Sequence, residues 1–181
     1  GVITPNDRHF VRWNWAMPTE VKAGEHRVAV GGAVKKAVSL TLDEIASAGE
    51  HVEIVAVNQC AGNGRGLSEP RVTGTQWGNG AMACAKWTGV RLKDVLAKAG
   101  MPATAKEVIL VGLDGYQIRV PVSDFVKWEV VLAHTQNGKR LEIETKGPLL
   151  VMYPNDKYPK ELRNHATNIK QVWALVSVKV Q

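Results

Sequence analysis

The chain has 181 residues, of which 45% are hydrophobic and 22% charged, and its formal net charge is +6. This composition is typical of a soluble globular domain, and we expect residues 1–181 to fold as a single domain. No apolar stretch reaches the roughly 18 residues that span a bilayer, so no membrane span is predicted. The basic residues are scattered and no nucleic-acid-binding motif accompanies them. The positive charge therefore favours an anionic ligand, an acidic protein partner or a solvated basic surface over nucleic acid.

The first part of the chain predicts short strands around one helix. Residues 26–32 form a strand pattern that ends in a glycine pair. Residues 39–49 predict a helix in which Thr41 is the N-cap and Glu44, three residues later, completes a capping box. Residues 51–57 alternate and are rich in β-branched side chains, which indicates a second strand.

The rest of the chain predicts one more helix, at residues 92–99, and then mostly strands. Turns are expected at Asp114-Gly115 and, as a hairpin, at Asn137-Gly138. The predicted strands are residues 107–113, 116–122, 130–134, 149–153 and 172–180. Many short strands and two or three helices without regular βαβ alternation favour an α+β fold.

Cys60 lies in the segment that carries the clearest chemical signal. The predicted strand leads into NQCAGNGRG at residues 58–66, which places three glycines near the cysteine and Arg65 five residues after it. Small residues let backbone amides approach a bulky ligand, and a guanidinium favours thiolate over thiol. A thiolate is a soft ligand that suits a redox metal. On the residues alone, a buried structural cysteine is the more common alternative.

Cys84, between two alanines, is expected to be a small buried hydrophobic residue. A disulfide between Cys60 and Cys84 also stays open, although it would be the only one in the chain.

The motif QCAGNGR at residues 59–65 resembles the cysteine motif of the sulfite-oxidase family. The resemblance spans about residues 1–180, and its further segments follow in the family's order. These are FVRWNW (10–15), QWGNGAM (76–82), KWTGVRLKDVL (86–96), YQIRVP (116–121), LAHTQNG (132–138) and GP (147–148).

The resemblance implies the sulfite-oxidase fold, with short mixed strands and a few helices around a molybdenum–molybdopterin cofactor whose metal is bound by Cys60. It implies that Arg12 and Arg65 hold an oxyanion and that Tyr116 hydrogen-bonds an oxygen ligand of the metal. Without the resemblance, these arginines could be ordinary surface residues, and the tyrosine could simply end a turn.

Four further residues are implied as cofactor contacts. Asn14 stands where the family has a histidine, and Lys170 lies one residue from the family's cofactor-binding lysine. Gly80 and Ala81 belong to the segment that follows the cysteine motif.

The chain departs from the family at the cations expected around the cofactor phosphate. The family's histidine and arginine positions are Thr145 and Leu150 here, and Gly64 replaces the second arginine of the cysteine motif. Basic residues in the same region could replace these cations, although a solvated loop explains them equally well: Lys146, Lys157, Lys160, Arg163 and His165.

The resemblance implies oxidation of sulfite to sulfate. Since the chain has no c-type haem motif, electrons are expected to pass to a separate carrier, such as a c-type cytochrome. A periplasmic location of an exported mature chain is expected, with the cytoplasm as the alternative.

Two other functions stay open. One is a sulfoxide reductase of the same family, acting on a substrate such as oxidised methionine. The larger sulfite oxidases carry a dimerisation domain that is not expected here, and its absence would fit such a reductase. The other is a non-catalytic subunit of a sulfur-oxidation complex. The joint presence of Cys60, Arg12, Arg65 and Tyr116 argues against the second.

Overall fold

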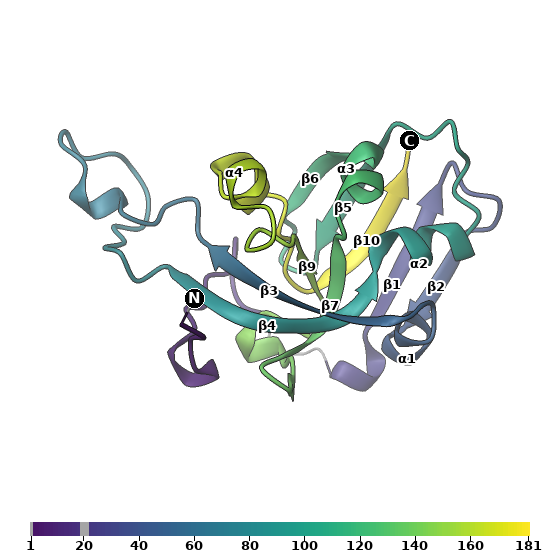
Figure 1. Cartoon of the computed structure of the whole chain (residues 1–181), viewed down its shortest axis with the longest axis horizontal. Coiled ribbons are helices and arrows are strands. Elements are labelled where there is room, and N and C mark those ends of the chain that lie inside the picture. Colours follow the sequence, from purple (N-terminus) through teal and green to yellow (C-terminus); the bar gives the residue numbers. More distant parts are fainter. Residues whose placement is uncertain (1, 19–21) are drawn as a thin grey trace.

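A computed structural model describes residues 2–18 and 22–181 of the chain. The described residues form strands and α-helices, most of which are labelled in Figure 1. The strands are β1 (Arg27–Gly32), β2 (Val38–Thr41), β3 (His51–Gln59), β4 (Met82–Arg91), β5 (Glu107–Gly112), β6 (Gln117–Pro121), β7 (Val131–Gln136), β8 (Lys139–Arg140), β9 (Leu150–Met152) and β10 (Leu175–Val180). The α-helices are α1 (Leu42–Ala46), α2 (Leu92–Lys98), α3 (Val122–Lys127), α4 (Pro159–Leu162) and α5 (His165–Asn168).

Two sheets form the framework of the molecule. The first has the strand order β2-β1-β10-β5-β6, in which only the β1–β10 pair is parallel among the described strands. The second has the order β3-β4-β7-β8 with β9 also paired to β7, and every described pair in it is antiparallel. Short helices and long connections surround the two sheets (Figure 1), which confirms the predicted α+β class.

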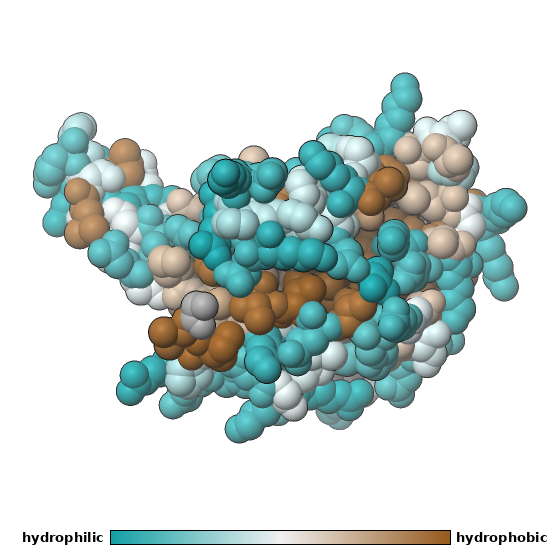
Figure 2. All heavy atoms as spheres, viewed as in Figure 1, coloured by the Kyte–Doolittle hydropathy of each residue, from teal (hydrophilic) through white to brown (hydrophobic). Residues whose placement is uncertain are grey.

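The main hydrophobic core joins both sheets to the helices. Leu110 and Leu132, from different sheets, are fully buried in it, as are Ile45 of α1 and Leu96 of α2. A smaller cluster centres on Trp87 of β4, whose indole N–H donates to the Ala56 carbonyl at 3.0 Å. Figure 2 shows a hydrophobic band on the surface over β3 and β4, with mainly hydrophilic surface around it.

The capping box predicted at Thr41 is confirmed. The Thr41 hydroxyl accepts the Glu44 amide at 3.2 Å, and the Glu44 carboxylate accepts the Thr41 amide at 2.8 Å. The prediction that the helix spans residues 39–49 is wrong at both ends. Ser39 and Leu40 belong to β2 and pair with β1, so tertiary pairing overrides the local helical pattern.

Other predicted boundaries also shift for local reasons. The predicted strand at 116–122 ends at Pro121, because Val122 begins α3. The predicted strand at 172–180 begins only at Leu175, because Ala174 has a left-handed φ of 44° that interrupts an extended backbone.

No strand was predicted over β4, although at ten residues it is the longest strand that the structure describes. Its first half contains Ala83-Cys84-Ala85, and small residues have little intrinsic preference for strands. Hydrogen-bonded neighbours on both sides, β3 and β7, stabilise it instead. The first half of β4 therefore depends on its sheet neighbours more than on its own sequence.

Residues 4–14, which we call the N-terminal strap, are held against the second sheet by polar contacts. The Thr4 amide donates to the Cys84 carbonyl at 2.7 Å, and Asn6 Nδ2 donates to the Gln136 carbonyl at 3.1 Å. Asn137 Nδ2 donates to the Thr4 carbonyl at 3.0 Å and to Asn6 Oδ1 at 2.7 Å. These contacts fix the start of the segment that carries Arg12.

Asn137 also forms the predicted hairpin turn, which is confirmed. Asn137 and Gly138 have φ values of 49° and 77°, as a two-residue hairpin turn of the primed type requires. Asn137 Oδ1 additionally accepts the Lys86 amide at 2.9 Å, so one side chain joins the turn, β4 and the strap.

Replacing Asn137 with glycine keeps a residue that tolerates positive φ but removes three side-chain hydrogen bonds. We expect the free energy of unfolding to fall by roughly 2 kcal/mol, since each such bond contributes about 0.5–1.5 kcal/mol. Asn137→Ala should lose about 1 kcal/mol more, because its Cβ makes the left-handed backbone unfavourable. Denaturant titration measures both losses, with Lys139→Ala in the same hairpin as the control. Wild-type stability of Asn137→Gly would show that the strap is held by other contacts.

Candidate functional site

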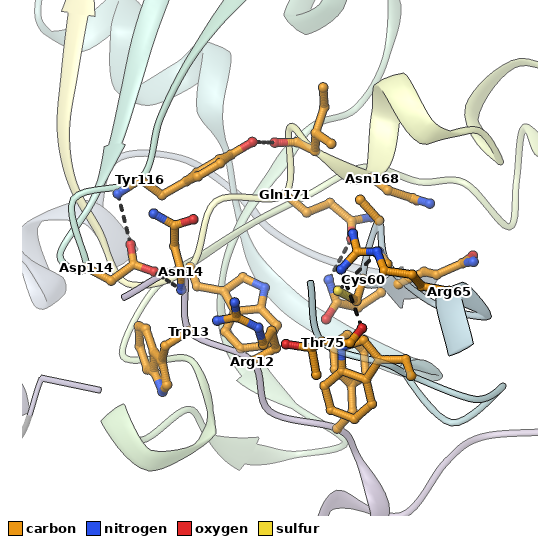
Figure 3. A pocket seen from close by; sticks show the side chains of 18 residues that line it. Arg12, Trp13, Asn14, Cys60, Arg65, Thr75, Asp114, Tyr116, Asn168 and Gln171 are labelled. Carbon is orange, nitrogen blue, oxygen red and sulfur yellow. Dashed lines mark hydrogen bonds between the residues drawn. The ribbon is translucent and has the colours of Figure 1, made fainter. Parts of the chain in front are cut away.

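A cavity of about 240 Å³ lies where five segments of the chain meet: the N-terminal strap, the end of β3, the loop of residues 60–81, the turn before β6 and residues 168–173 (Figure 3). Its lining residues are Phe10, Arg12, Trp13, Asn14, Asn58, Gln59, Cys60, Ala61, Gly62, Arg65, Thr75, Trp77, Asp114, Tyr116, Asn168, Ile169, Gln171 and Trp173.

Cys60 follows the last residue of β3 and is fixed there by its backbone. Its amide donates to the Ala81 carbonyl at 2.9 Å, so the loop of residues 60–81, which projects from the left side of Figure 1, is closed at its base. The Gly62 amide donates to Cys60 Sγ at 3.4 Å. This contact holds the sulfur at the end of β3 and orients it within the loop.

Arg65 is held beside Cys60 by the same loop (Figure 3). Its Nη1 donates to the Thr75 carbonyl at 3.4 Å. Two glycines make room for the guanidinium: a Cβ on Gly62 would lie 2.9 Å from Arg65 Cζ, and one on Gly74 would overlap its Nη1. Because Gly74 also has a φ of 117°, a side chain there would be both strained and in collision.

Asp114 organises the opposite side of the cavity (Figure 3). One carboxylate oxygen accepts the Asn14 amide at 2.7 Å, and the other accepts the Tyr116 amide at 3.1 Å. The Tyr116 hydroxyl donates to the Ile169 carbonyl at 2.7 Å. Burial, together with the Asp114 charge, raises the pKa of Tyr116, so the phenol stays protonated at neutral pH.

Three buried polar atoms of the cavity lining have no hydrogen-bond partner among the described residues. They are the indole nitrogens of Trp13 and Trp77 and the Oδ1 atom of Asn58. Asn58 Nδ2 is satisfied by Gln171 Oε1 at 2.6 Å, which fixes the orientation of the amide. Buried polar atoms are nearly always paired, so two donors and an acceptor are available here to a polar ligand.

The cavity brings together five of the eight residues proposed from the sequence. Arg12, Asn14, Cys60, Arg65 and Tyr116 all line it. Arg12 is exposed and forms no ion pair with any described residue, so its guanidinium is available to a ligand.

Gly80, Ala81 and Lys170 do not line this cavity. Ala81 is fully buried, and its amide donates to Asn63 Oδ1 at 2.9 Å, so this segment closes the cysteine loop. The Lys170 ammonium is 2.7 Å from Asp124 Oδ2 and is neutralised by that carboxylate. The structure therefore places these three beside the site and not in it.

Cys84 lies on β4 opposite Val57, whereas Cys60 lies opposite Ala81, and both cysteines are free thiols. Three residues of strand correspond to about 10 Å, beyond the roughly 7 Å that a disulfide bridges between Cα atoms. Burial raises the pKa of Cys84, which disfavours its thiolate. Both thiols line a second cavity of about 440 Å³ on the other side of Cys60.

Several polar residues of the site could not be assigned a specific role from the sequence. Asn58, Thr75, Asp114 and Gln171 line the cavity but belong to no motif whose chemistry names them. For Asn58 and Gln171 a signal exists only in three dimensions, since they are 2% and 5% exposed despite being polar. Trp13 lines the cavity, whereas Trp15 is 73% exposed and lies outside its lining.

Comparison with known proteins identifies the family. The sequence profile of the oxidoreductase molybdopterin binding domain matches residues 14–157. The chain belongs to this family. Sulfite oxidase of Gallus gallus is 33% identical over 165 residues, which cover 84% of this chain and 36% of that protein. Nitrate reductase [NAD(P)H] of Hordeum vulgare is 32% identical over 168 residues, covering 85% of this chain and 19% of that enzyme.

A solved structure supports the fold. The sulfane dehydrogenase SoxCD from Paracoccus pantotrophus matches with a TM-score of 0.81 at 22% identity, covering 99% of this chain and 44% of that one. This chain thus spans less than half the length of each of these three proteins.

The cofactor of this family is molybdenum held by molybdopterin, and the cavity suits it. Cys60 offers a soft sulfur ligand beside two arginines that favour negative charge. The unpartnered indole N–H groups of Trp13 and Trp77 and the Asn58 oxygen offer the mixture of donors and acceptors that a pterin ring and oxygen ligands need.

Cys60→Ser should remove the sulfur-to-molybdenum absorption band and abolish turnover while the protein stays folded, because serine is nearly isosteric but a hard oxygen donor. Cys84→Ser is the matched control and should keep the band, at a cost of roughly 1 kcal/mol in stability. Metal analysis and visible absorption of the two purified variants provide the measurement. Loss of the band in Cys84→Ser with its retention in Cys60→Ser would reverse the roles of the two cysteines.

Proposed function

We propose that this domain oxidises sulfite to sulfate at its molybdenum centre and passes the electrons to a separate carrier, such as a c-type cytochrome. The observation that carries the proposal is that Arg12, Arg65 and Tyr116 line the same cavity as Cys60. Two guanidinium groups at one cavity are suited to a small divalent oxyanion, because their paired N–H groups match two oxygens at once.

The two arginines differ in how they are held. Arg65 is enclosed by its own loop and bonded to the Thr75 carbonyl, so it offers a fixed charge beside Cys60. Arg12 comes from the N-terminal strap and is exposed, so it can turn toward an entering anion. Together they supply one rigid and one adaptable contact to the substrate.

When bound, molybdenum supplies the two-electron redox change and the oxygen atom that is exchanged. The residues of the chain position the reactants and control the protons. The Tyr116 hydroxyl is protonated and donates its hydrogen to the Ile169 carbonyl. Its oxygen can therefore still accept a hydrogen bond from a protonated group of a ligand. For the phenol to donate toward the substrate, it must first leave that carbonyl. Phe10, Trp13, Trp77 and Trp173 provide apolar walls that limit water around the reacting anion.

The relatives name two kinds of oxyanion chemistry, because one is a sulfite oxidase and another a nitrate reductase. Sulfoxide reduction is a third reaction of interest. We expect the holoprotein to reduce ferricyanide with sulfite, and to show little turnover of nitrate or methionine sulfoxide with a reduced dye. Turnover of nitrate or sulfoxide without sulfite oxidation would refute the proposal. No turnover in any assay, with molybdenum bound, would favour a non-catalytic subunit.

Arg12→Gln and Arg65→Gln should each lower kcat/KM for sulfite by roughly 10- to 150-fold. The estimate corresponds to about 1.5–3 kcal/mol for a lost charge-assisted contact. Arg71→Gln, an exposed residue on the same loop as Arg65, removes an equal charge outside the cavity and should leave kcat/KM unchanged. Steady-state kinetics with ferricyanide measures all three. Equal kinetics in the wild type and both cavity variants would place the substrate elsewhere.

The cellular location and the electron acceptor of the protein are also part of the proposal. Within residues 2–18 and 22–181, the structure has no helix with the length and hydrophobicity of a membrane span. We place the protein in the periplasm, in line with the export expected from the family resemblance, and fractionation of the native host tests this.

Transient redox partners bury little surface and are steered mainly by charge. With a net charge of +6, this chain favours an acidic docking face on its carrier.

Raising the ionic strength from about 0.01 to 0.15 M shortens the Debye length from roughly 30 to 8 Å. The second-order rate with the native carrier should therefore fall, because the charges that steer the encounter are screened. The rate with a small neutral dye is the control and should barely change. Stopped-flow measurement across this range decides the matter, and a carrier rate that does not vary with salt would exclude electrostatic steering.

A further inference from the structure

Lys146 is a fully buried lysine in a strained backbone conformation. The residue is 0% exposed, and its φ of 86° lies in the left-handed region, which residues other than glycine and asparagine rarely adopt. Its ammonium has one hydrogen bond, to Gln136 Oε1 at 3.4 Å. It otherwise faces two indole rings, with centroid distances of 5.5 Å to Trp173 and 6.0 Å to Trp87.

No carboxylate of the described residues pairs with this ammonium. Burial lowers the pKa of Lys146 to about 7. The titratable neighbour that responds to it is His9, whose pKa is lowered to about 4 by burial and by the Lys146 charge. A buried charge without a counter-ion destabilises a protein, as does a strained backbone. Lys146 therefore costs the folded chain stability in two ways.

Lys146 and His9 lie directly behind the aromatic wall of the cofactor cavity. Trp173 lines the cavity and has the Lys146 ammonium near its ring. Phe10 also lines the cavity, and the His9 ring stacks on it with centroids 5.4 Å apart. A positive charge at this depth acts on the cavity through protein and not through water, so it is weakly screened.

The other basic residues considered for the cofactor phosphate are engaged or exposed. Lys157 pairs with Glu129 at 3.4 Å, and Arg163 pairs with Asp156. Lys160 and His165 are exposed. Among these candidates, Lys146 alone is both buried and without a counter-ion.

We propose that Lys146 is the buried cation that offsets the negative charge of the bound molybdopterin, so that its missing counter-ion is the cofactor itself. The cofactor carries a phosphate and an anionic dithiolene, and a buried ammonium behind one aromatic layer stabilises such a ligand without contacting the substrate. Lys146 is thus a cofactor-retention residue. The inference rests on the family's cofactor and is independent of whether sulfite is the substrate.

Lys146→Met tests the proposal, because methionine keeps an unbranched side chain of similar length and removes the charge. Wild type and variant are purified from a host that makes the cofactor and from one that does not. The measurements are the amount of molybdenum and pterin per chain, the rate at which pterin fluorescence appears on mild heating, and the melting temperature of the apoprotein. The control is Lys86→Met, which removes the same charge from a side chain that is 52% exposed on β4.

Lys146→Met should release the cofactor about tenfold faster than wild type, equivalent to about 1.4 kcal/mol. Its apoprotein should melt at the wild-type temperature or above, because an unpaired buried charge is gone. Lys86→Met should match wild type in both measurements. If Lys146→Met does not fold, Lys146→Gln keeps a polar head without the charge and should show the same faster release.

Unchanged cofactor release in a folded variant would overturn the proposal. So would an apoprotein that loses as much stability as the holoprotein, because that result would assign Lys146 a structural role. Neither measurement uses sulfite, so a failure of the sulfite assay in wild type leaves this test intact.

Discussion

The antiparallel pairing of β3 with β4 determines where the chemistry of this protein takes place. Cys60 follows β3, and its amide donates a hydrogen bond to the carbonyl of Ala81, the residue that precedes β4. The first and last residues of the loop between them are therefore held together by a backbone hydrogen bond at the end of the sheet. Because the base is fixed, the Gly62 amide can point at the sulfur and Arg65 can lie beside it. Without this pairing, the cysteine and the arginine would be two unrelated loop residues.

The remaining walls of the site are attached to that pairing by polar contacts. The N-terminal strap is bonded to β4 through Thr4 and to the β7–β8 turn through Asn137, and this brings Arg12 to the cavity. Asp114 then joins the strap to the turn before β6 by accepting amides from both. The site is therefore built from segments far apart in sequence that come from both sheets: the end of β3, the strap bonded to β4, and the turn between β5 and β6.

The parts of this arrangement that local chemistry controls were predictable. The Thr41 capping box and the Asn137-Gly138 turn depend on a few neighbouring residues, and Cys60 and Arg65 share one short motif. The first half of β4 was not predictable, because its small residues form a strand only by pairing with β3. The burial of Asn58 also has no local signal. Its amide is fixed by Gln171, which lies more than a hundred residues away.

Lys146 shows the same limit most clearly, because in sequence it is one lysine in a basic stretch. Only the packing of Trp87, Trp173 and Gln136 around it reveals that it is buried. The site thus contains two kinds of positive charge. Arg12 and Arg65 reach the cavity itself, where water exchanges and a substrate can come and go. Lys146 has no access to water, so its ammonium, when protonated, acts on the cavity with little screening by solvent. A mobile substrate is best held by the first kind of charge and a resident cofactor by the second, since screening by solvent weakens only the first.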